Sequence, residues 1–157
     1  MPSSIAVRRA TVDDADDCVR IVAGLTDYFS DEEPPAVRQD LGRHDGWVIT
    51  DADAVVGFLV IERRSSAVAE IRWAGVASER RGTGLGSRLL TEVLGALHGL
   101  GVEYVTLKTL DGSVPSAAYA ATRAFWERHG FVQVDAIDPY PGWRPGNPAA
   151  LYVRALP

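Results

Sequence analysis

A glycine-rich loop is the part of this sequence best suited to hold a charged ligand. It runs from Arg81 to Ser87 with the sequence RGTGLGS, between an apolar segment and an amphipathic one. Glycines let the main chain turn tightly and approach a ligand closely. A helix that starts at such a loop presents unpaired N–H groups and the positive end of its dipole. With Arg80 and Arg81 beside it, the loop is suited to bind a diphosphate.

Other phosphate-binding loops fit this stretch less well. The P-loop pattern G-x-x-x-x-G-K-[ST] is absent, since no lysine follows the glycines. A dinucleotide-binding G-x-G-x-x-G, counted from Gly82, requires Gly or Ala where Ser87 stands, and that loop follows the first strand of its fold. A glycine-rich turn with a solvated arginine pair and no ligand is the alternative.

Glu70 is the carboxylate best placed to accept a proton. It is the only acidic residue in the apolar segment before the loop, six residues ahead of Val76. Removal from water raises the pKa of a carboxyl group, which suits a general base. A structural role, in which Glu70 pairs with Arg72 or with an arginine on a neighbouring strand, is equally open.

The composition limits the other chemistries that the chain can perform. Its 157 residues are the length of one domain, so residues 1–157 are predicted to form a single one. The net charge of −5 argues against nucleic acid as a partner. Cys18 is the single cysteine and the three histidines lie far apart, so neither a disulfide nor a metal site is expected. With no apolar signal core or long apolar run, we expect no membrane partner and a cytoplasmic location.

The elements around these residues follow a regular order. The patterning predicts strands over 4–9, 47–50, 54–61, 68–77, 102–110, 131–137 and 149–155, and helices over about 11–29, 36–43, 85–98 and 116–129. The segment Ser30–Pro35, rich in acids and proline, is predicted to form a loop that ends the first helix. Hairpins give antiparallel neighbours and helical crossovers give parallel ones. The order therefore predicts one mixed sheet with helices on both faces.

Two stretches resemble the GNAT family of N-acetyltransferases. Arg81–Gly86 matches the family's acetyl-CoA signature [QR]-x-x-G-x-[GA], and Val76–Arg80 matches the preceding V-x-P-x-x except that Ser78 replaces the proline. Ala124–Phe131 is similar to the family's late-helix motif A-x-x-[FL]-Y-x-x-x-G-F. The resemblance covers nearly the whole chain in element order, and the two motifs are its specific part.

The resemblance implies a fold, a co-substrate and a reaction. The fold is α/β (α+β), with a mostly antiparallel sheet of six to seven strands and a central parallel pair that splays apart. Acetyl-CoA would be the co-substrate, with no metal, and its acetyl group would pass directly to a primary amine on a small molecule or peptide. Glu70 would be the general base, and pairing of the late strands would allow a homodimer. The implied cofactor contacts are Trp73, Ala74, Gly75 and Val76 for the pantetheine arm, Arg81, Gly82, Thr83, Gly84, Leu85, Gly86 and Ser87 for the diphosphate, and Trp126 on the late helix.

The late helix departs from the family at two positions. Trp126 stands where the family often has a tyrosine that protonates the departing thiolate, and an indole N–H cannot transfer a proton. Tyr119, about two turns earlier on the same face, is the first candidate for that role, although the family often has asparagine there. Tyr140 and His129 are weaker candidates. A non-catalytic, regulatory domain that binds acyl-CoA is therefore the alternative to an enzyme.

The sequence carries no code for the acceptor. The acidic run Asp31–Glu33 lies in a region that borders the acceptor site in the family, where an acidic rim would attract a cationic amine. A solvated acidic loop explains the same residues. Trp47, Trp73 and Trp143 either line a pocket or pack in the core.

Overall fold

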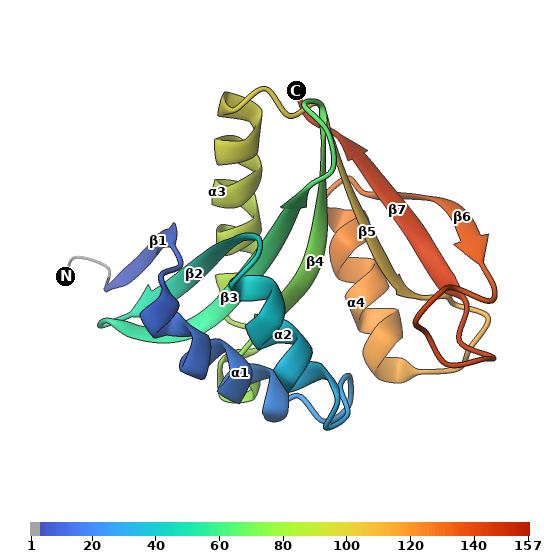
Figure 1. The fold of residues 1–157 in the computed structure, drawn as a ribbon, viewed down its shortest axis with the longest axis horizontal. Coiled ribbons are helices and arrows are strands. Elements are labelled where there is room, and N and C mark those ends of the chain that lie inside the picture. Colours follow the sequence, from blue (N-terminus) through green and yellow to red (C-terminus); the bar gives the residue numbers. More distant parts are fainter. Residues whose placement is uncertain (1–3) are drawn as a thin grey trace.

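Seven strands form one sheet in the order β1-β2-β3-β4-β5-β7-β6 in the computed structural model, which describes residues 4–157 (Figure 1). The strands are β1 (Ile5–Arg9), β2 (Asp45–Asp51), β3 (Ala54–Arg63), β4 (Val68–Val76), β5 (Tyr104–Leu110), β6 (Val132–Ile137) and β7 (Ala149–Ala155). The helices are α1 (Ala15–Ala23), α2 (Glu33–Leu41), α3 (Leu85–Gly99) and α4 (Ala117–Arg128), with short 3-10 turns η1 (Val12–Asp14) and η2 (Ser78–Arg80). The predicted element order and mixed, mostly antiparallel sheet are confirmed.

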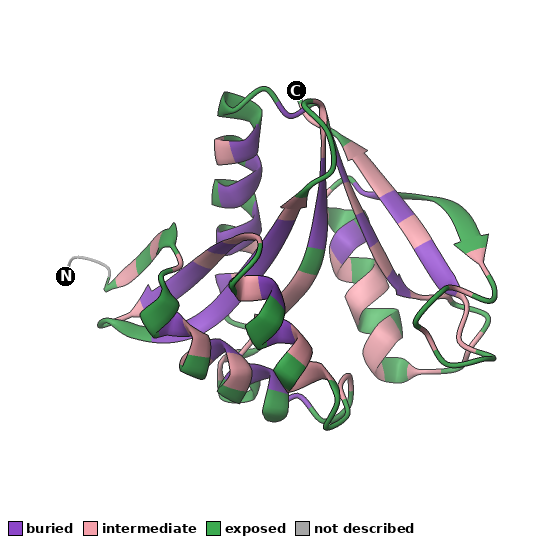
Figure 2. Cartoon of the chain, in the orientation of Figure 1, coloured by how far each residue is buried: buried purple, intermediate pink, exposed green. Residues whose placement is uncertain are grey.

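Each face of the sheet is covered by two helices that bury an apolar stripe against it. On one face, α1 and α2 bury Cys18 and Val37 against Phe58 of β3. On the other face, α3 buries Leu89 and Val93 in a second cluster that also contains residues of α4. Figure 2 shows the buried stretches of α3 on its side toward the strands. Within residues 4–157, no helix is long and apolar enough to cross a membrane.

The parallel pair β4 and β5 is joined along only part of its length. Its ladder runs from Val68 opposite Tyr104 to Ile71 opposite Leu107, and then it stops. Beyond that point the rest of β4 stays paired with β3, and the rest of β5 stays paired with β7. Figure 1 shows the two strands diverging toward their carboxyl ends. The splayed pair implied by the resemblance is therefore present.

A β-bulge in β4 lies at the point where the strands separate. Ile71 is opposite Ile61 and Trp73 is opposite Val60, so Arg72 is an extra residue on β4. A bulge of this kind changes which face the following side chains occupy. Ile71 packs in the α3 cluster, whereas Trp73 packs against the α1–α2 cluster.

The region between α1 and β2 differs from the prediction in two ways. The first helix ends at Ala23, not near Phe29, because Gly24 caps it and the amides of Tyr28 and Phe29 turn back to the Leu25 carbonyl. The second helix begins at Glu33 and takes both prolines into its first turn. The prediction that they lie in a loop was wrong, because a helix makes no internal bonds with its first amides and so tolerates proline there.

The surroundings of two glycines predict that alanine substitutions at these positions change the free energy of unfolding in opposite directions. A Cβ at Gly57 would lie 2.8 Å from Ile49 Cγ2, whereas nothing lies within 4 Å of a Cβ at Gly95 in α3. Gly57→Ala should therefore lower the free energy of unfolding by about 1–3 kcal/mol. Gly95→Ala should raise it by about 0.5–1 kcal/mol, because alanine favours a helix interior. Urea titrations measure both values, and effects of the same sign would contradict this packing.

Candidate active site

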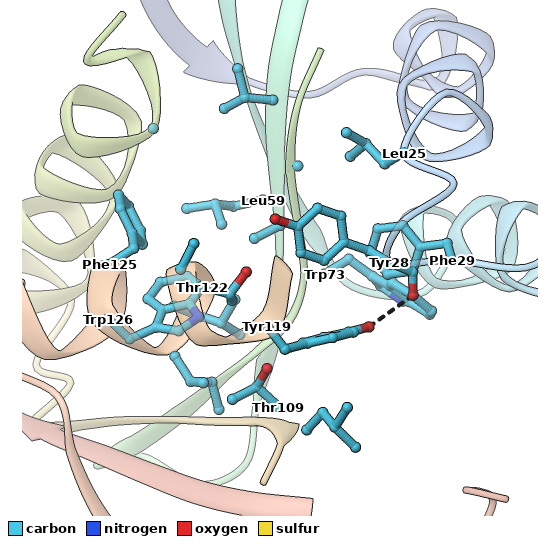
Figure 3. A pocket seen from close by; sticks show the side chains of 18 of the residues that line it. Leu25, Tyr28, Phe29, Leu59, Trp73, Thr109, Tyr119, Thr122, Phe125 and Trp126 are labelled. Atoms are coloured by element: carbon cyan, nitrogen blue, oxygen red, sulfur yellow. Dashed lines mark hydrogen bonds between the residues drawn. The ribbon is translucent and has the colours of Figure 1, made fainter. Parts of the chain in front are cut away.

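A cleft of about 1050 Å³ opens where β4 and β5 separate. Its walls come from these two strands, the loop before α3, α4, and the segments before α2 and between β6 and β7. Figure 3 shows Tyr28 and Phe29 on one side and Tyr119, Phe125 and Trp126 of α4 on the other. The residues that the sequence singled out as catalytic or cofactor contacts line this one cleft, except His129.

The loop before α3 is shaped by two glycines in the left-handed region. Gly82 has φ +74° and Gly84 has φ +82°, and no atom lies within 4 Å of a Cβ built at either position. The amides of the first turn of α3 have no acceptor inside the helix. The first bond at this end joins the Arg88 N–H to the Gly84 carbonyl at 3.1 Å. The loop therefore presents donors and open space, which are the requirements of an anion site.

The two arginines beside the loop have different surroundings. Arg80 forms an ion pair of 2.6 Å with Asp51, so its charge is already balanced. Arg81 forms no ion pair within residues 4–157, and its guanidinium carbon lies 4.8 Å from the ring centre of Tyr28. Arg81 is therefore the arginine whose charge remains available to a bound anion.

Among residues 4–157, the edge of β4 that faces the cleft has no strand partner beyond Ile71. Trp73, Ala74, Gly75 and Val76 remain paired with β3 on their other side. A strand edge of this kind offers unpaired backbone groups to an extended chain. These four residues could therefore hold a linear ligand in the way that β5 holds the first half of β4.

Glu70 lies at the base of the cleft and is paired. Only 7% of its surface is exposed, and its Oε2 accepts a bond of 2.6 Å from Lys108 Nζ on β5. Arg64, just after β3, is farther away at 3.8 Å. Arg72 pairs instead with Asp40 and Glu62, so of the two predicted alternatives it is the arginine beside the neighbouring strand, Arg64, that lies within ion-pair distance of Glu70.

Lys108 was not found from the sequence, although a signal was available. It is the chain's only lysine among sixteen basic residues, and it stands in an otherwise uncharged strand. Its Nζ also lies 5.2 Å from the ring centre of Tyr140. Burial disfavours the charge on Lys108, but the bonds to Glu70 and Tyr140 outweigh burial and raise the pKa of this ammonium group above its ordinary value.

Tyr119 and Tyr28 join the two sides of the cleft by reciprocal bonds. The Tyr119 hydroxyl donates to the Tyr28 carbonyl at 2.8 Å, and the Tyr28 hydroxyl donates to the Ala118 carbonyl at 3.2 Å. Their rings meet edge to face, with centres 5.3 Å apart. Burial, with smaller contributions from Glu33 and Tyr28, raises the pKa of the Tyr119 phenol. We call this arrangement the Tyr28–Tyr119 clamp.

Asp40 fixes the orientation of two side chains of the β4 bulge. Its Oδ2 accepts bonds from Arg72 Nε at 2.8 Å and from Trp73 Nε1 at 2.7 Å. Asp40 is buried in α2 and belongs to no sequence motif that would mark it as a functional residue. Asp40 of α2 therefore fixes the position of the Trp73 indole at the cleft.

The remaining candidates lie in packed surroundings. Trp126 is buried between Phe125 and Phe131, with ring centres 5.0 and 5.5 Å away. His129 faces Ser87, with its Nε2 2.9 Å from the serine Oγ, and burial lowers the pKa of this imidazole. Cys18 is fully buried and burial raises the pKa of its thiol to about 12, which leaves no reactive thiolate at neutral pH.

The sequence matches the family model of the acetyltransferase (GNAT) domain over residues 42–133. The chain belongs to the GNAT family. The resemblance that rested on two motifs is confirmed. In this GNAT acetyltransferase the whole of Arg81–Gly86 lines the cleft, whereas Ala124–Phe131 lines it only in part. A comparison with curated proteins gave no match.

Solved structures share the fold of this acetyltransferase along its full length. A GNAT-family acetyltransferase from Desulfovibrio desulfuricans, described as putative, has a TM-score of 0.84 and 23% identity, and the match covers 98% of this chain and 99% of that one. The ribosomal-protein-S18-alanine N-acetyltransferase of Escherichia coli has a TM-score of 0.78 and 19% identity, covering 97% and 94%. A GNAT acetyltransferase from Elizabethkingia anophelis with acetyl-CoA bound has a TM-score of 0.74 and 17% identity, covering 99% and 100%. At these identities the comparisons show the fold alone.

The ion pair at the base of the cleft predicts a titration that can be observed directly. Because the folded-state pKa of Lys108 is raised, the pair stabilises the fold below about pH 10.5 and loses this contribution as the pH rises through the raised value. Glu70→Gln should lower the pKa of Lys108, because it removes the carboxylate that outweighs burial. Protein labelled with ¹³C-lysine gives one side-chain signal to follow, since the chain has one lysine.

Glu62→Gln is the matched control for this titration. Glu62 stands opposite Glu70 on β3 and pairs with Arg64 and Arg72. Its replacement should leave the Lys108 titration near the wild-type curve. Identical curves for wild type and Glu70→Gln would show that the pair does not form in solution.

Proposed function

We propose that this GNAT acetyltransferase transfers an acetyl group from acetyl-CoA directly to a primary amine. The observation that carries the proposal is that the cleft combines an unpaired edge of β4, a loop of open amides and the buried carboxylate of Glu70. The Elizabethkingia protein, with the same fold, carries acetyl-CoA, and the Escherichia coli protein acetylates an amine by its name. Both facts support the proposal without assigning the acceptor.

The residues of the cleft fit coenzyme A in two parts. The loop from Arg81 to Ser87 offers backbone donors, two glycines without neighbours and one unpaired arginine, which suit a diphosphate. The stretch from Trp73 to Val76 offers a strand edge, which suits the amide groups of a pantetheine arm. These two sets of residues would hold the co-substrate, with Trp126 as part of the wall.

Acetyl-CoA supplies an acetyl thioester, so that the amine nitrogen can bond to the acetyl carbon as the carbon–sulfur bond breaks. Glu70 is proposed to take the proton that the ammonium group of the acceptor must lose, directly or through one water molecule. Lys108 keeps the Glu70 carboxylate in place on the cleft side of the sheet. The base therefore stands next to Ile71, where the parallel ladder ends.

Tyr119 is proposed to protonate the departing thiolate in place of the tyrosine that Trp126 replaces. A phenol is protonated at neutral pH, as a proton donor requires, and burial raises the pKa of Tyr119 further. The bond to the Tyr28 carbonyl holds the hydroxyl at the cleft. Trp126 packs between two phenylalanines and contributes an apolar wall.

A loop glycine should matter for coenzyme A binding because of its place in the cleft, and not only because of its left-handed backbone conformation. Gly84→Ala and Gly101→Ala form a matched pair, because both glycines have similar positive φ values and open surroundings, but only Gly84 lines the cleft. Each should cost about 1–2 kcal/mol of stability from the left-handed backbone. Only Gly84→Ala should weaken coenzyme A binding, by about tenfold or more. Calorimetric titration decides this, and equal affinities would remove the loop from the binding site.

The two proposed proton-transfer residues should affect opposite limbs of the pH–rate profile. Glu70→Gln should lower kcat by about 10²–10⁴-fold and remove the acidic limb, with coenzyme A affinity unchanged. Tyr119→Phe should remove the alkaline limb. Glu62→Gln is the control, because Glu62 neighbours Glu70 on β3 and does not line the cleft.

Two results would contradict these assignments. An unchanged profile in Glu70→Gln would remove Glu70 from the mechanism. Coenzyme A that raises the melting temperature, with no free thiol released in the presence of any amine, would instead support a regulatory domain that binds acyl-CoA without turnover.

A further inference from the structure

Four large aromatic side chains line the cleft beside the Glu70–Lys108 pair. We call the region that they enclose the acceptor chamber, and its walls are Phe29, Trp73, Tyr140 and Trp143. Trp73 stands three residues after Glu70 on β4, and Tyr140 lies 5.2 Å from Lys108 Nζ. The four rings therefore line the same cleft as the carboxylate to which the proposed function assigns the acceptor's proton.

The aromatic residues of the chamber form two pairs on different segments. Phe29, before α2, and Trp73 of β4 have ring centres 5.9 Å apart. Tyr140 and Trp143, both between β6 and β7, have ring centres 5.5 Å apart. Asp40 holds the Trp73 indole by a bond of 2.7 Å. The cleft therefore offers aromatic surface from two separate segments to a flat apolar group.

Each carboxylate that lines the cleft has a partner within the described residues. Glu70 is bonded to Lys108, and Glu32 lies 3.9 Å from Arg144. Glu33 accepts bonds from the backbone and side chain of Ser30. Asp31, the first residue of the predicted acidic rim, does not line the cleft, so the cleft supplies no row of open carboxylates for a molecule with several positive charges.

We propose that the acceptor is an arylalkylamine, which is a primary amine on a short alkyl arm attached to an aromatic ring. This inference rests on the proposed function and names its substrate class. The ring would bury its faces between the two aromatic pairs, and the single ammonium group would face Glu70, with support from the aromatic faces. Polyamines, aminoglycosides and peptides carry further polar groups that would lose water here without gaining partners.

Initial rates with a panel of amines test the inference. At saturating acetyl-CoA, kcat/KM for 2-phenylethylamine and tryptamine should exceed that for spermidine, kanamycin and a peptide with a free N-terminal alanine by about tenfold or more. A higher kcat/KM for spermidine, kanamycin or the peptide would overturn the inference.

Two aromatic-to-alanine variants locate the effect in the chamber. Phe29→Ala and Trp143→Ala should each lower kcat/KM for tryptamine by about tenfold, with coenzyme A affinity unchanged. Tyr104→Ala is the control, because Tyr104 is a half-exposed aromatic residue that does not line the cleft. Unchanged kcat/KM in both chamber variants would overturn the inference even if tryptamine were a good substrate.

The panel also separates this inference from the proposed function. If the protein acetylates other amines but not arylalkylamines, the substrate class is wrong and the proposed function stands. If it binds coenzyme A and acetylates no amine in the panel, calorimetric titration with tryptamine then tests the chamber alone. Absence of tryptamine binding would overturn the substrate class, and binding without turnover would retain the chamber as an arylalkylamine site and reject the transfer reaction.

Discussion

The site depends on a parallel ladder that stops after four residue pairs. Ile71 and Leu107 are the last partners, and past them β4 and β5 each keep a neighbour on one side only. Unpaired backbone groups in a sheet are costly when they are buried away from water. The cleft keeps them accessible, and an extended ligand can complete the interrupted hydrogen bonding. The pairings of β4 with β3 and of β5 with β7 thus keep the sheet stable, and the missing pairing between the ends of β4 and β5 leaves room for an extended ligand.

The β4 bulge determines on which face of the sheet each side chain of β4 lies at that opening. Strict alternation would place Ile71 and Trp73 on one face, but the extra residue Arg72 separates them. Glu70 and Trp73 consequently lie on the face covered by α1 and α2, while Ile71 and Val76 pack toward α3. Asp40 accepts bonds from both side chains of the bulge and so ties this geometry to α2. The proposed base and the acceptor chamber owe their common location to one irregularity.

Local patterns were sufficient to predict most of the fold and the cofactor loop. The glycine spacing after Val76 and the apolar periodicity of α3 are patterns of residues close together in the sequence, so the loop and its helix could be predicted directly. Contacts between distant segments could not be predicted in this way. Lys108 meets Glu70 only because β4 and β5 are parallel neighbours in a particular register, and Asp40 meets Trp73 only through the bulge.

The Tyr28–Tyr119 clamp connects two properties that an enzyme would otherwise adjust separately. Tyr28 stands next to Phe29 on the wall of the acceptor chamber, and its carbonyl fixes the hydroxyl of the proposed proton donor on α4. A backbone shift at Tyr28 that reshapes this wall would therefore also move the hydroxyl of the proposed proton donor. Under the proposed function, acceptor preference and turnover would be coupled through the Tyr28–Tyr119 clamp.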